Sequence, residues 1–529
     1  MDFSSLQLPT SVTAVYSSGY DRPGVGAALY RQDSDQSTTM ANRRRRRISD
    51  GRWFVLSESE VNVTMTGARG DGRHDDTAAI QEALDAALTV IVPGADRHYR
   101  ITAPLVLRAG QIVRGEGDRS RIIQSAGGAS AAALWGDRLQ DLTVADLHVT
   151  PGPAGPNFLH GHAILLRDCT GIRIERLTVS GHRRGGVTLQ NCSTAVVRSC
   201  GVGASSVNPV ADDHTATGYD ILVVNGGSDI LIADNRCVNG AGTGIGVQST
   251  ATSEPFTFHN IRIENNVVDE QGCYGILVYR SNLDKFENIR VTGNTVSNIS
   301  GSVRQSTYGR VFGAGIYIQG VDGTVVAGNS VRRTNLTTEI EMLAPAGIGV
   351  ANATDVRIED NLVEDCGWYG VCVFDPNGEG STDGVSRIVG NVIRNNAKTG
   401  ICTKDIRAAT VTRNTVTDNG EHGFLSRSHS PRTAAARHDL RDNRFADNAG
   451  QGIFFLGGDG DLLNNDISHN DGGGVVLGSA GRFQLVGNRI ANNGAWGVSG
   501  VPAAKTTMRD NRFDDNRTGD VSLPGTPLS

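Results

Sequence analysis

An asparagine recurs along the chain at intervals of 22 to 35 residues, and this repeat limits the fold more than any other feature. The shortest interval separates Asn443 from Asn465, and the longest separates Asn294 from Asn329. Apolar residues alternate before and after each asparagine, and a glycine then opens a further alternating stretch. Such self-similarity predicts a β-solenoid in which each repeat is one coil of short strands. The aligned residues are Asn235, Asn266, Asn294, Asn329, Asn361, Asn391, Asn414, Asn443, Asn465, Asn488 and Asn511.

The repeated asparagine has a structural explanation. One coil has no core of its own, so successive coils must stack and satisfy one another's backbone groups. An asparagine at the same corner of every coil tolerates the left-handed backbone of a tight turn. Its amide can also bond to the next asparagine in the stack. We therefore expect a structural ladder and no chemistry from these residues.

Composition agrees with a turn-rich fold and excludes some functions. The chain has 529 residues, with 67 Gly but only 15 Pro, so turns must be frequent. Its net charge of −6 argues against a nucleic-acid partner. The eight cysteines form no C-x-x-C pair and suggest buried thiols, without metal-site spacing. We expect no metal and no cofactor, although a calcium ion stays compatible with the sequence.

The sequence gives few signals for location. The first residues, Met1 to Leu6, lack the basic and apolar regions of a signal peptide, and no apolar run is long enough to cross a bilayer. We expect a soluble protein with no membrane partner. Its location stays open, with extracellular and particle-associated sites both compatible.

An entry segment resembles a known family. Val61-Asn62-Val63, the Gly67 to Gly72 stretch and Asp75-Asp76-Thr77 resemble the start of pectate-lyase-superfamily right-handed parallel β-helix proteins. The resemblance implies an all-β, single-stranded right-handed parallel β-helix over residues 60–520, with a helix near residues 76–88 capping the first coil. An Asp N-cap gives a physical reason for that helix. The fold hosts lyases, hydrolases, epimerases and non-enzymatic tail parts, and its members are often trimers, so a homotrimer is possible.

The ends of the chain are expected to lie outside the β-helix. Residues 1–59 resemble the leader of phage tailspike-like proteins, and residues 521–529 form a short tail. Arg43 to Arg47 is a basic run that could bind an anionic glycan or a nucleic acid, but we interpret it as a solvated loop.

Aligning the glycines that open successive strands predicts an outward column of side chains. The column reads Tyr279, Gln319, Ala351, Phe374, Lys404 and Arg427, and the next position reads Arg280, Gly320, Asn352, Asp375, Asp405 and Ser428. Neighbouring strands lie about 4.8 Å apart, so Asp375 and Asp405 should face the same side at close range. In β-helix polysaccharide enzymes the groove usually follows this strand. We predict catalytic roles for Asp375, Asp405, Lys404, Arg427, Tyr279 and Arg280.

Other residues are expected to contact the substrate. Long insertions beside this face would form the walls of a groove on the middle coils. The predicted substrate-binding residues are Tyr317, Gln319, Phe374, Glu379, Asp213, His214 and Tyr369.

Two chemistries fit this cluster. A hydrolase needs two carboxyl groups, which Asp375 and Asp405 could supply. A lyase or C5-epimerase needs a cation to neutralise a uronate, together with a base and an acid such as tyrosine. Tyr369-Gly370 and Asp375-Pro376 partly resemble the Tyr-Gly-Phe-Asp-Pro-His-Glu run of mannuronan C5-epimerases, with Asn377 in place of the histidine.

We therefore predict a protein that binds a polysaccharide and cleaves it as a lyase or glycoside hydrolase. A mannuronan-type C5-epimerase and a non-catalytic, tailspike-like glycan-binding protein are the alternatives. Each of these residues could also have a structural role and no role in function. Lys404 and Asp405, for example, could form an ordinary surface ion pair.

Overall fold

The computed structural model describes residues 3–35, 42, 44–125, 132–152, 161–205, 218–249, 255–281, 284–300, 304–305, 310–311, 313–335, 345–375, 385–427 and 436–523. The chain divides into two compact units, residues 1–211 with 220–223 and residues 212–219 with 224–529. The boundaries expected from the sequence for the leader (residues 1–59), the β-helix (60–520) and the tail (521–529) remain predictions.

The first unit combines an antiparallel sheet with parallel coils. The sheet has the order β1-β2-β4-β3, from β1 (Ala14–Ser17), β2 (Ala28–Gln32), β3 (Arg45–Arg47) and β4 (Trp53–Leu56). The coils that follow contain β5 (Glu60–Asn62), β6 (Asp71–Asp75), β7 (Thr89–Ile91), β8 (His98–Ile101), β9 (Leu105–Val106), β10 (Ile112–Arg114), β11 (Arg121–Gln124), β12 (Leu134–Asp137), β13 (Gln140–Ala145), β14 (His148–Thr150), β15 (His162–Arg167), β16 (Thr170–Glu175), β17 (Thr178–Ser180), β18 (Gly185–Arg198) and β19 (Gly201–Gly203).

Residues Arg45–Arg47 of the basic run form the strand β3, so the prediction of a solvated loop is wrong for these residues. Arg45 is buried, its Nε donates to Asp33 at 2.7 Å, and its guanidinium lies 4.6 Å from the Trp53 ring centroid. The guanidinium of Arg46 lies 4.8 Å from the Tyr20 ring centroid. Aromatic faces attract these cations, and strand pairing with β4 holds their backbone. The described arginines of the run are thereby engaged within the fold.

The predicted capping helix is present as α1 (Thr77–Ala86). It buries Ala79, Ile80, Ala83 and Leu84. The Asp76 side chain, however, makes no hydrogen bond to the helix backbone. Its carboxylate instead accepts from the backbone N–H groups of Arg69 at 2.8 Å and Gly70 at 3.1 Å. The prediction of an aspartate at the N-cap position is thus confirmed, but the carboxylate of Asp76 fixes the loop before the helix and does not bond to the helix backbone.

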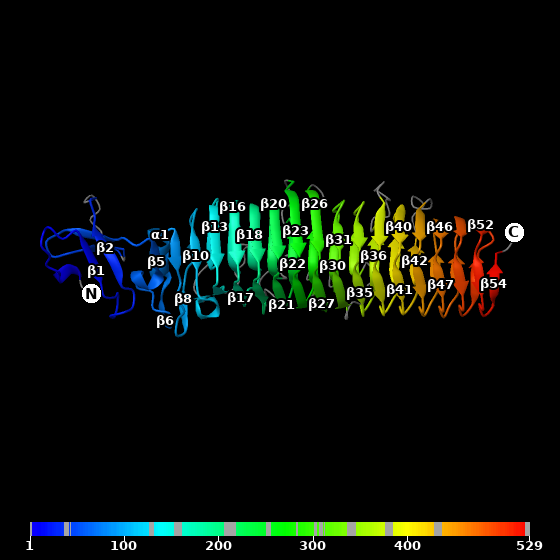
Figure 1. The fold of residues 1–529 in the computed structure, drawn as a ribbon, viewed down its shortest axis with the longest axis horizontal. Helices are drawn as coiled ribbons and strands as arrows, with labels where there is room; N and C mark the ends of the chain where they lie inside the picture. The colour runs from blue at the N-terminus through cyan, green and yellow to red at the C-terminus, as the bar shows by residue number, and fades with distance from the viewer. Residues whose placement is uncertain are drawn as a thin grey trace. The chain divides into compact units, whose positions relative to one another are not determined.

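The second unit repeats a three-strand coil, and Figure 1 shows strands of successive coils side by side within it. Three rows of parallel strands make up this unit. Residues 227–233 of β20 (Tyr219–Ala233) pair with β23, which is the first strand of the second row. The first row comprises β22 (Thr243–Gln248), β25 (Tyr274–Tyr279), β30 (Ala314–Gln319), β33 (Ala346–Ala351), β36 (Tyr369–Phe374), β39 (Ile401–Lys404), β42 (Phe424–Arg427), β45 (Ile453–Phe455), β48 (Val475–Leu477), β51 (Trp496–Gly500) and β54 (Gly519–Ser522).

Two further rows complete the coils. The second row comprises β23 (Thr257–Glu264), β26 (Lys285–Thr292), β31 (Val325–Ala327), β34 (Arg357–Glu359), β37 (Ser386–Val389), β40 (Ala408–Thr412), β43 (Arg437–Arg441), β46 (Asp459–Leu463), β49 (Arg482–Val486) and β52 (Lys505–Arg509). The third row comprises β21 (Arg236–Gly240), β24 (Val267–Gln271), β27 (Thr295–Ile299), β32 (Ser330–Thr334), β35 (Leu362–Glu364), β38 (Val392–Arg394), β41 (Thr415–Thr417), β44 (Arg444–Ala446), β47 (Asp466–Ser468), β50 (Arg489–Ala491) and β53 (Arg512–Asp514).

Alternation of side chains forms the core. Strands of one row pair in parallel, for example Ile276 with Ile316 and Ile316 with Ile348, and all three side chains are fully buried. Residues on either side of these positions point outward, as the period of two requires. The prediction of an all-β parallel solenoid with a capping helix is confirmed.

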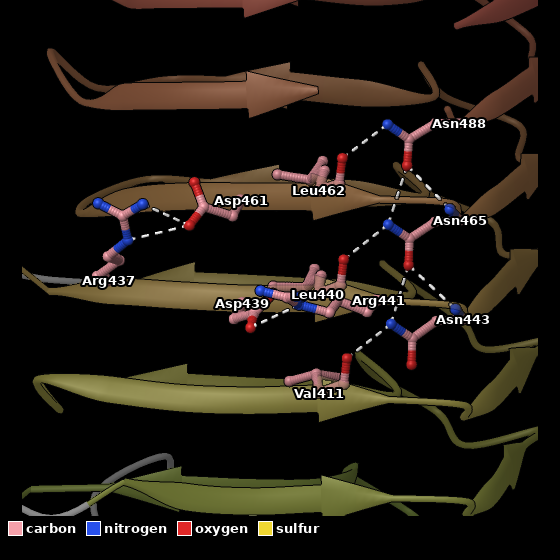
Figure 2. A network of polar contacts seen from close by, with 10 residues as sticks. All are labelled: Val411, Arg437, Asp439, Leu440, Arg441, Asn443, Asp461, Leu462, Asn465 and Asn488. Carbon is pink, nitrogen blue, oxygen red and sulfur yellow. Dashed lines mark hydrogen bonds and ion pairs between the residues drawn. The ribbon is translucent and has the colours of Figure 1, made fainter. Parts of the chain in front are cut away.

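The predicted asparagine ladder lies between the second and third rows. Asn443 Nδ2 donates to Asn465 Oδ1 at 2.9 Å, and Asn465 Nδ2 donates to Asn488 Oδ1 at 3.0 Å (Figure 2). The same contact runs from Asn235 to Asn511. The left-handed residue is, however, the one before each asparagine, such as Asp442 with φ 55°. The prediction that the asparagines themselves take this conformation is wrong, because their side chains face inward.

A second ladder was not predicted. Five residues after each of the last six asparagines of the first ladder, another asparagine begins the turn from the third row to the next coil. Asn396 Nδ2 donates to Asn419 Oδ1 at 2.9 Å, and the pattern continues in the following coils. The members are Asn396, Asn419, Asn448, Asn470, Asn493 and Asn516.

All eight cysteines are buried free thiols, as predicted. Cys372 pairs in register with Cys402. No helix in the described parts of the chain is both long and apolar enough to cross a bilayer.

Candidate functional site

The first row carries the outward column that the sequence predicted. Strand register places Tyr279 beside Gln319, Gln319 beside Ala351, and Ala351 beside Phe374. It then places Phe374 beside Lys404 and Lys404 beside Arg427. Tyr279, Gln319, Lys404 and Arg427 are partly exposed. We call this set, from Tyr279 to Arg427, the outer column.

The two predicted carboxylates follow the outer column directly. The Asp375 backbone N–H donates to the Lys404 carbonyl at 3.0 Å, and the Asp405 N–H donates to the Arg427 carbonyl at 2.8 Å. Asp375 and Asp405 thus hold equivalent places in adjacent coils. They are only 4 % and 8 % exposed. Lys404 is closer to solvent, and its Nζ lies 5.1 Å from the Phe374 ring centroid.

The register divides the predicted catalytic residues into two groups. Four strand spacings separate Tyr279 from Lys404, which is about 19 Å at about 4.8 Å per spacing. Tyr279 and Arg280 therefore cannot contact the sugar that Lys404 and Arg427 contact. Asp375, Lys404, Asp405 and Arg427, in contrast, come from three adjacent coils.

Arg280 is held by its own surroundings. Its Nη1 donates to the Gly320 carbonyl at 3.1 Å and lies 3.7 Å from the Asp322 carboxylate. The side chain is partly exposed and is held by both contacts. Arg280 is therefore better suited to provide a fixed positive charge at the edge of the outer column than to transfer a proton.

Tyr317 does not present its ring to solvent. The ring is 3 % exposed and stacks on Tyr274, with centroids 5.4 Å apart. Burial raises the pKa of the Tyr317 hydroxyl. That hydroxyl has no hydrogen-bond partner among the described residues. Tyr317 is thus covered by Tyr274 on the face that alternation turns outward, and its predicted contact with substrate stays a prediction.

The remaining predicted contacts have different outcomes. Phe374 and Tyr369 are buried, at 5 % and 6 % exposure. Glu379, Asp213 and His214 lie outside the described residues.

The structure adds two polar arrangements that the sequence did not reveal. Gln248 precedes Tyr279 in the same column, and its Nε2 donates to the Tyr219 hydroxyl at 2.8 Å. In the first unit, His182 Nε2 lies 2.9 Å from Asp220 Oδ1, with both side chains buried. Neither arrangement follows from the repeat, since Gln248 precedes the aligned strands and His182 lies in a turn.

Two family models match the chain. The model described as "Rhamnogalacturonase A/epimerase, pectate lyase-like" matches residues 60–300, and the model described as "Right handed beta helix region" matches residues 377–525. Both parts of the chain are thus similar to right-handed β-helix families, and the first part is similar to pectate-lyase-like proteins. This agrees with the resemblance and the fold inferred from its entry segment and repeats.

Individual relatives of this β-helix protein are distant. Mannuronan C5-epimerase AlgE2 of Azotobacter vinelandii is 24% identical over 260 residues, 41% of this chain and 25% of that protein. The chain thus spans a quarter of that relative's length. Among solved structures, pre-mature gene product 12 of bacteriophage phi29 is similar with a TM-score of 0.53 and 11% identity, over 87% of this chain and 73% of that chain. The A-module of Azotobacter vinelandii mannuronan C-5 epimerase AlgE6 matches with a TM-score of 0.32 and 16% identity, over 88% and 100%. The phi29 likeness shows a shared fold.

Proposed function

We propose that this protein binds an acidic polysaccharide along the outer column and removes the proton at C5 of a bound uronate. The product is then either an unsaturated chain end, as in a lyase, or an inverted sugar, as in an epimerase. Asp405, Lys404 and Arg427 are the residues to which we assign the chemistry.

The outer column is the observation that carries this proposal. Its side chains repeat at the spacing of adjacent strands, about 4.8 Å, which is similar to the length of one pyranose unit in an extended chain. Aromatic, amide and cationic groups follow one another along it, as a sugar polymer with carboxylates requires. Tyr279 and Gln319 would then hold sugars several units away from the reacting one.

The assigned chemistry follows from charge and position. Lys404 and Arg427 lie side by side, so they can neutralise the sugar carboxylate and the negative charge that develops when C5 loses its proton. Asp405 follows Lys404 in the chain and is bonded through its backbone to Arg427, so its carboxylate is the candidate base. The name of the distant relative, a mannuronan C5-epimerase, supports the same class of step.

Hydrolysis is a second candidate because Asp375 and Asp405 occupy adjacent coils. Hydrolysis needs both carboxyl groups to reach one glycosidic bond. Proton abstraction needs only one carboxylate at the sugar, so it makes a smaller demand on these two side chains.

The test uses a panel of acidic and neutral polysaccharides in D₂O. We expect either deuterium at C5 of a uronate, detected by NMR, for an epimerase, or the ultraviolet absorbance of an unsaturated uronate for a lyase. Asp405→Asn should reduce the rate of either reaction at least about 100-fold, as expected for loss of a general base. Asp418→Asn is the matched control, because Asp418 shares the left-handed backbone of Asp405 (φ 57° and 54°) and is exposed on the third row. New reducing ends without deuterium and without unsaturated uronate would show hydrolysis, and binding without any of these signals would show a glycan-binding protein.

A further inference from the structure

A column of arginines runs along the second row, away from the outer column. Register places Arg262 beside Arg290, Arg290 beside Val325, Val325 beside Arg357, and Arg357 beside Arg387. All four arginines are exposed. We call these four residues the arginine column.

The arginine column is only partly neutralised. Arg262 Nη1 lies 3.7 Å from Glu264, and Arg290 Nε donates to Asn288 at 3.2 Å. The side chains of Arg357 and Arg387 form no hydrogen bond or ion pair with other described residues. Like charges in neighbouring strands destabilise a sheet, so these two arginines impose a cost that an external anion would relieve.

The column has defined ends. It is preceded by Leu231, and beyond Arg387 the same register position is held by Thr410, Asp439 and Asp461. There each carboxylate is paired, Asp439 with Arg441 Nε at 2.6 Å and Asp461 with Arg437 Nε at 3.0 Å (Figure 2). In the later coils, these charges are balanced within the protein, in contrast to Arg357 and Arg387.

We propose that the arginine column is a second binding track for a linear, carboxylated polysaccharide. The exposed cations form two pairs, Arg262 with Arg290 and Arg357 with Arg387, with one strand spacing of about 4.8 Å within each pair and Val325 between the pairs. Such a line of cations suits a narrow chain that carries an anion on each sugar. The track is one side chain wide, since Glu264 and Glu359 occupy the outward positions two residues further along their strands. A nucleic-acid duplex is much wider and would meet those carboxylates. The track goes beyond the proposed function because it lies on other strands and needs no chemistry.

The test compares two double variants that remove the same charge. Arg357→Gln with Arg387→Gln removes the two arginines that form no ion pair with other described residues. Arg482→Gln with Lys505→Gln removes two exposed cations that are register neighbours on β49 and β52 of the same row. Both are made in a Lys404→Gln, Arg427→Gln background, so that binding at the outer column does not mask the result. The probe is fluorescently labelled sodium polygalacturonate, followed by polarisation at low and high salt.

We expect the arginine variant to weaken polygalacturonate binding about fivefold, as two exposed ion pairs would, with a weaker salt dependence. The control should change binding less than about twofold. Thermal midpoints should match, because none of the replaced side chains is buried. Equal losses in the two variants, no binding by the parent, or loss of binding to a labelled DNA duplex but not to polygalacturonate would overturn the proposal.

Discussion

At the scale of single residues, strand register decides which side chains can act on the same sugar. Lys404 and Arg427 are neighbours across one strand spacing, whereas Tyr279 is four spacings from Lys404. A side chain that is distant from the reacting sugar stabilises the bound substrate and the transition state about equally, whereas a neighbouring cation acts on the charge that develops in the transition state. Residues of one column therefore have different kinetic roles.

This difference can be measured. Lys404→Gln should lower kcat at least about tenfold, because its charge acts on the reacting sugar. Tyr279→Ala should raise KM several-fold and leave kcat within about twofold, because it removes binding without touching the reacting atoms. Steady-state kinetics on a long polymer checks both, and a loss of kcat with Tyr279→Ala would contradict the assignment.

His438 is a buried histidine that the proposed function does not use. Its ring lies among Phe424 and Phe455, and its Nε2 is 3.5 Å from the Thr403 hydroxyl. Burial lowers the pKa of His438 to about 4, because the charged imidazole would lose its hydration. The native protein therefore keeps this ring neutral at a pH where the unfolded chain protonates it.

Acid should weaken the fold through His438. The unfolded ring titrates near its ordinary pKa of 6.5, so the stabilisation is complete above pH 6.5 and is lost as pH falls towards 4. Between pH 7 and pH 4.5 the loss from this residue is about 2 to 3 kcal/mol. Urea unfolding of the wild type and His438→Gln at both pH values measures it. An equal pH dependence in the two proteins would contradict this account.

The sequence predicted where side chains sit in the repeat better than how deeply they are buried. The outer column follows from counting alternate residues after each glycine, because strand geometry leaves only two faces. The burial of Tyr317 depends on Tyr274, which comes from a neighbouring coil, and no repeat pattern contains that contact. The aromatic partners of Arg45 and Arg46 are likewise tertiary contacts.

At the scale of the structural element, the turns carry much of the polar stabilisation of the coils. The Asn443 side chain donates to Asn465 and the Val411 carbonyl and accepts from the backbone and amide of Asn414. Asn511, at the end of the same ladder, has three such bonds and is less buried.

The loss of free energy of unfolding when an asparagine is replaced should therefore depend on its position in the ladder. Asn443→Ala should destabilise the protein by about 2 to 4 kcal/mol, because it leaves buried groups on both sides without partners. Asn511→Ala should cost at least about 1 kcal/mol less, because fewer groups lose a partner and water reaches the site. Chemical denaturation measures both; equal losses would show that the ladder is not cooperative.

The glycine that opens a first-row strand is required by close packing. A Cβ on Gly370 would lie 2.4 Å from Ile393 Cγ2 and 2.7 Å from the Gly400 carbonyl. Gly370→Ala should therefore destabilise the protein by about 1 to 3 kcal/mol. Gly201→Ala is the control, because nothing lies within 4 Å of its added Cβ, and its stability should be unchanged or slightly raised. Thermal unfolding of the two variants checks this, and similar midpoints would contradict the packing argument.

Much of the element order could be predicted because one asparagine marks every coil. The second ladder was missed because it begins only at Asn396, and in the preceding coils Cys366 and Thr334 take its place. The bonds of Asp76 could not be predicted either, since a carboxylate before a helix commonly caps it.

At the scale of the whole molecule, the regular stacking of coils determines where surface side chains can form a binding site. The coils set a constant spacing, and the polar side chains of the outer column and of the arginine column lie at one or more multiples of this spacing. Whether three chains assemble, as the family resemblance implies, stays a prediction.

The location of bound sugar is the central claim, and a crystal structure of the Asp405→Asn protein with a hexasaccharide of the preferred uronate tests it most directly. We predict sugar rings along the outer column, with one carboxylate within hydrogen-bond distance of Lys404 and Arg427. Sugar found only on the second or third row, with the outer column unoccupied at saturating ligand, would contradict the account.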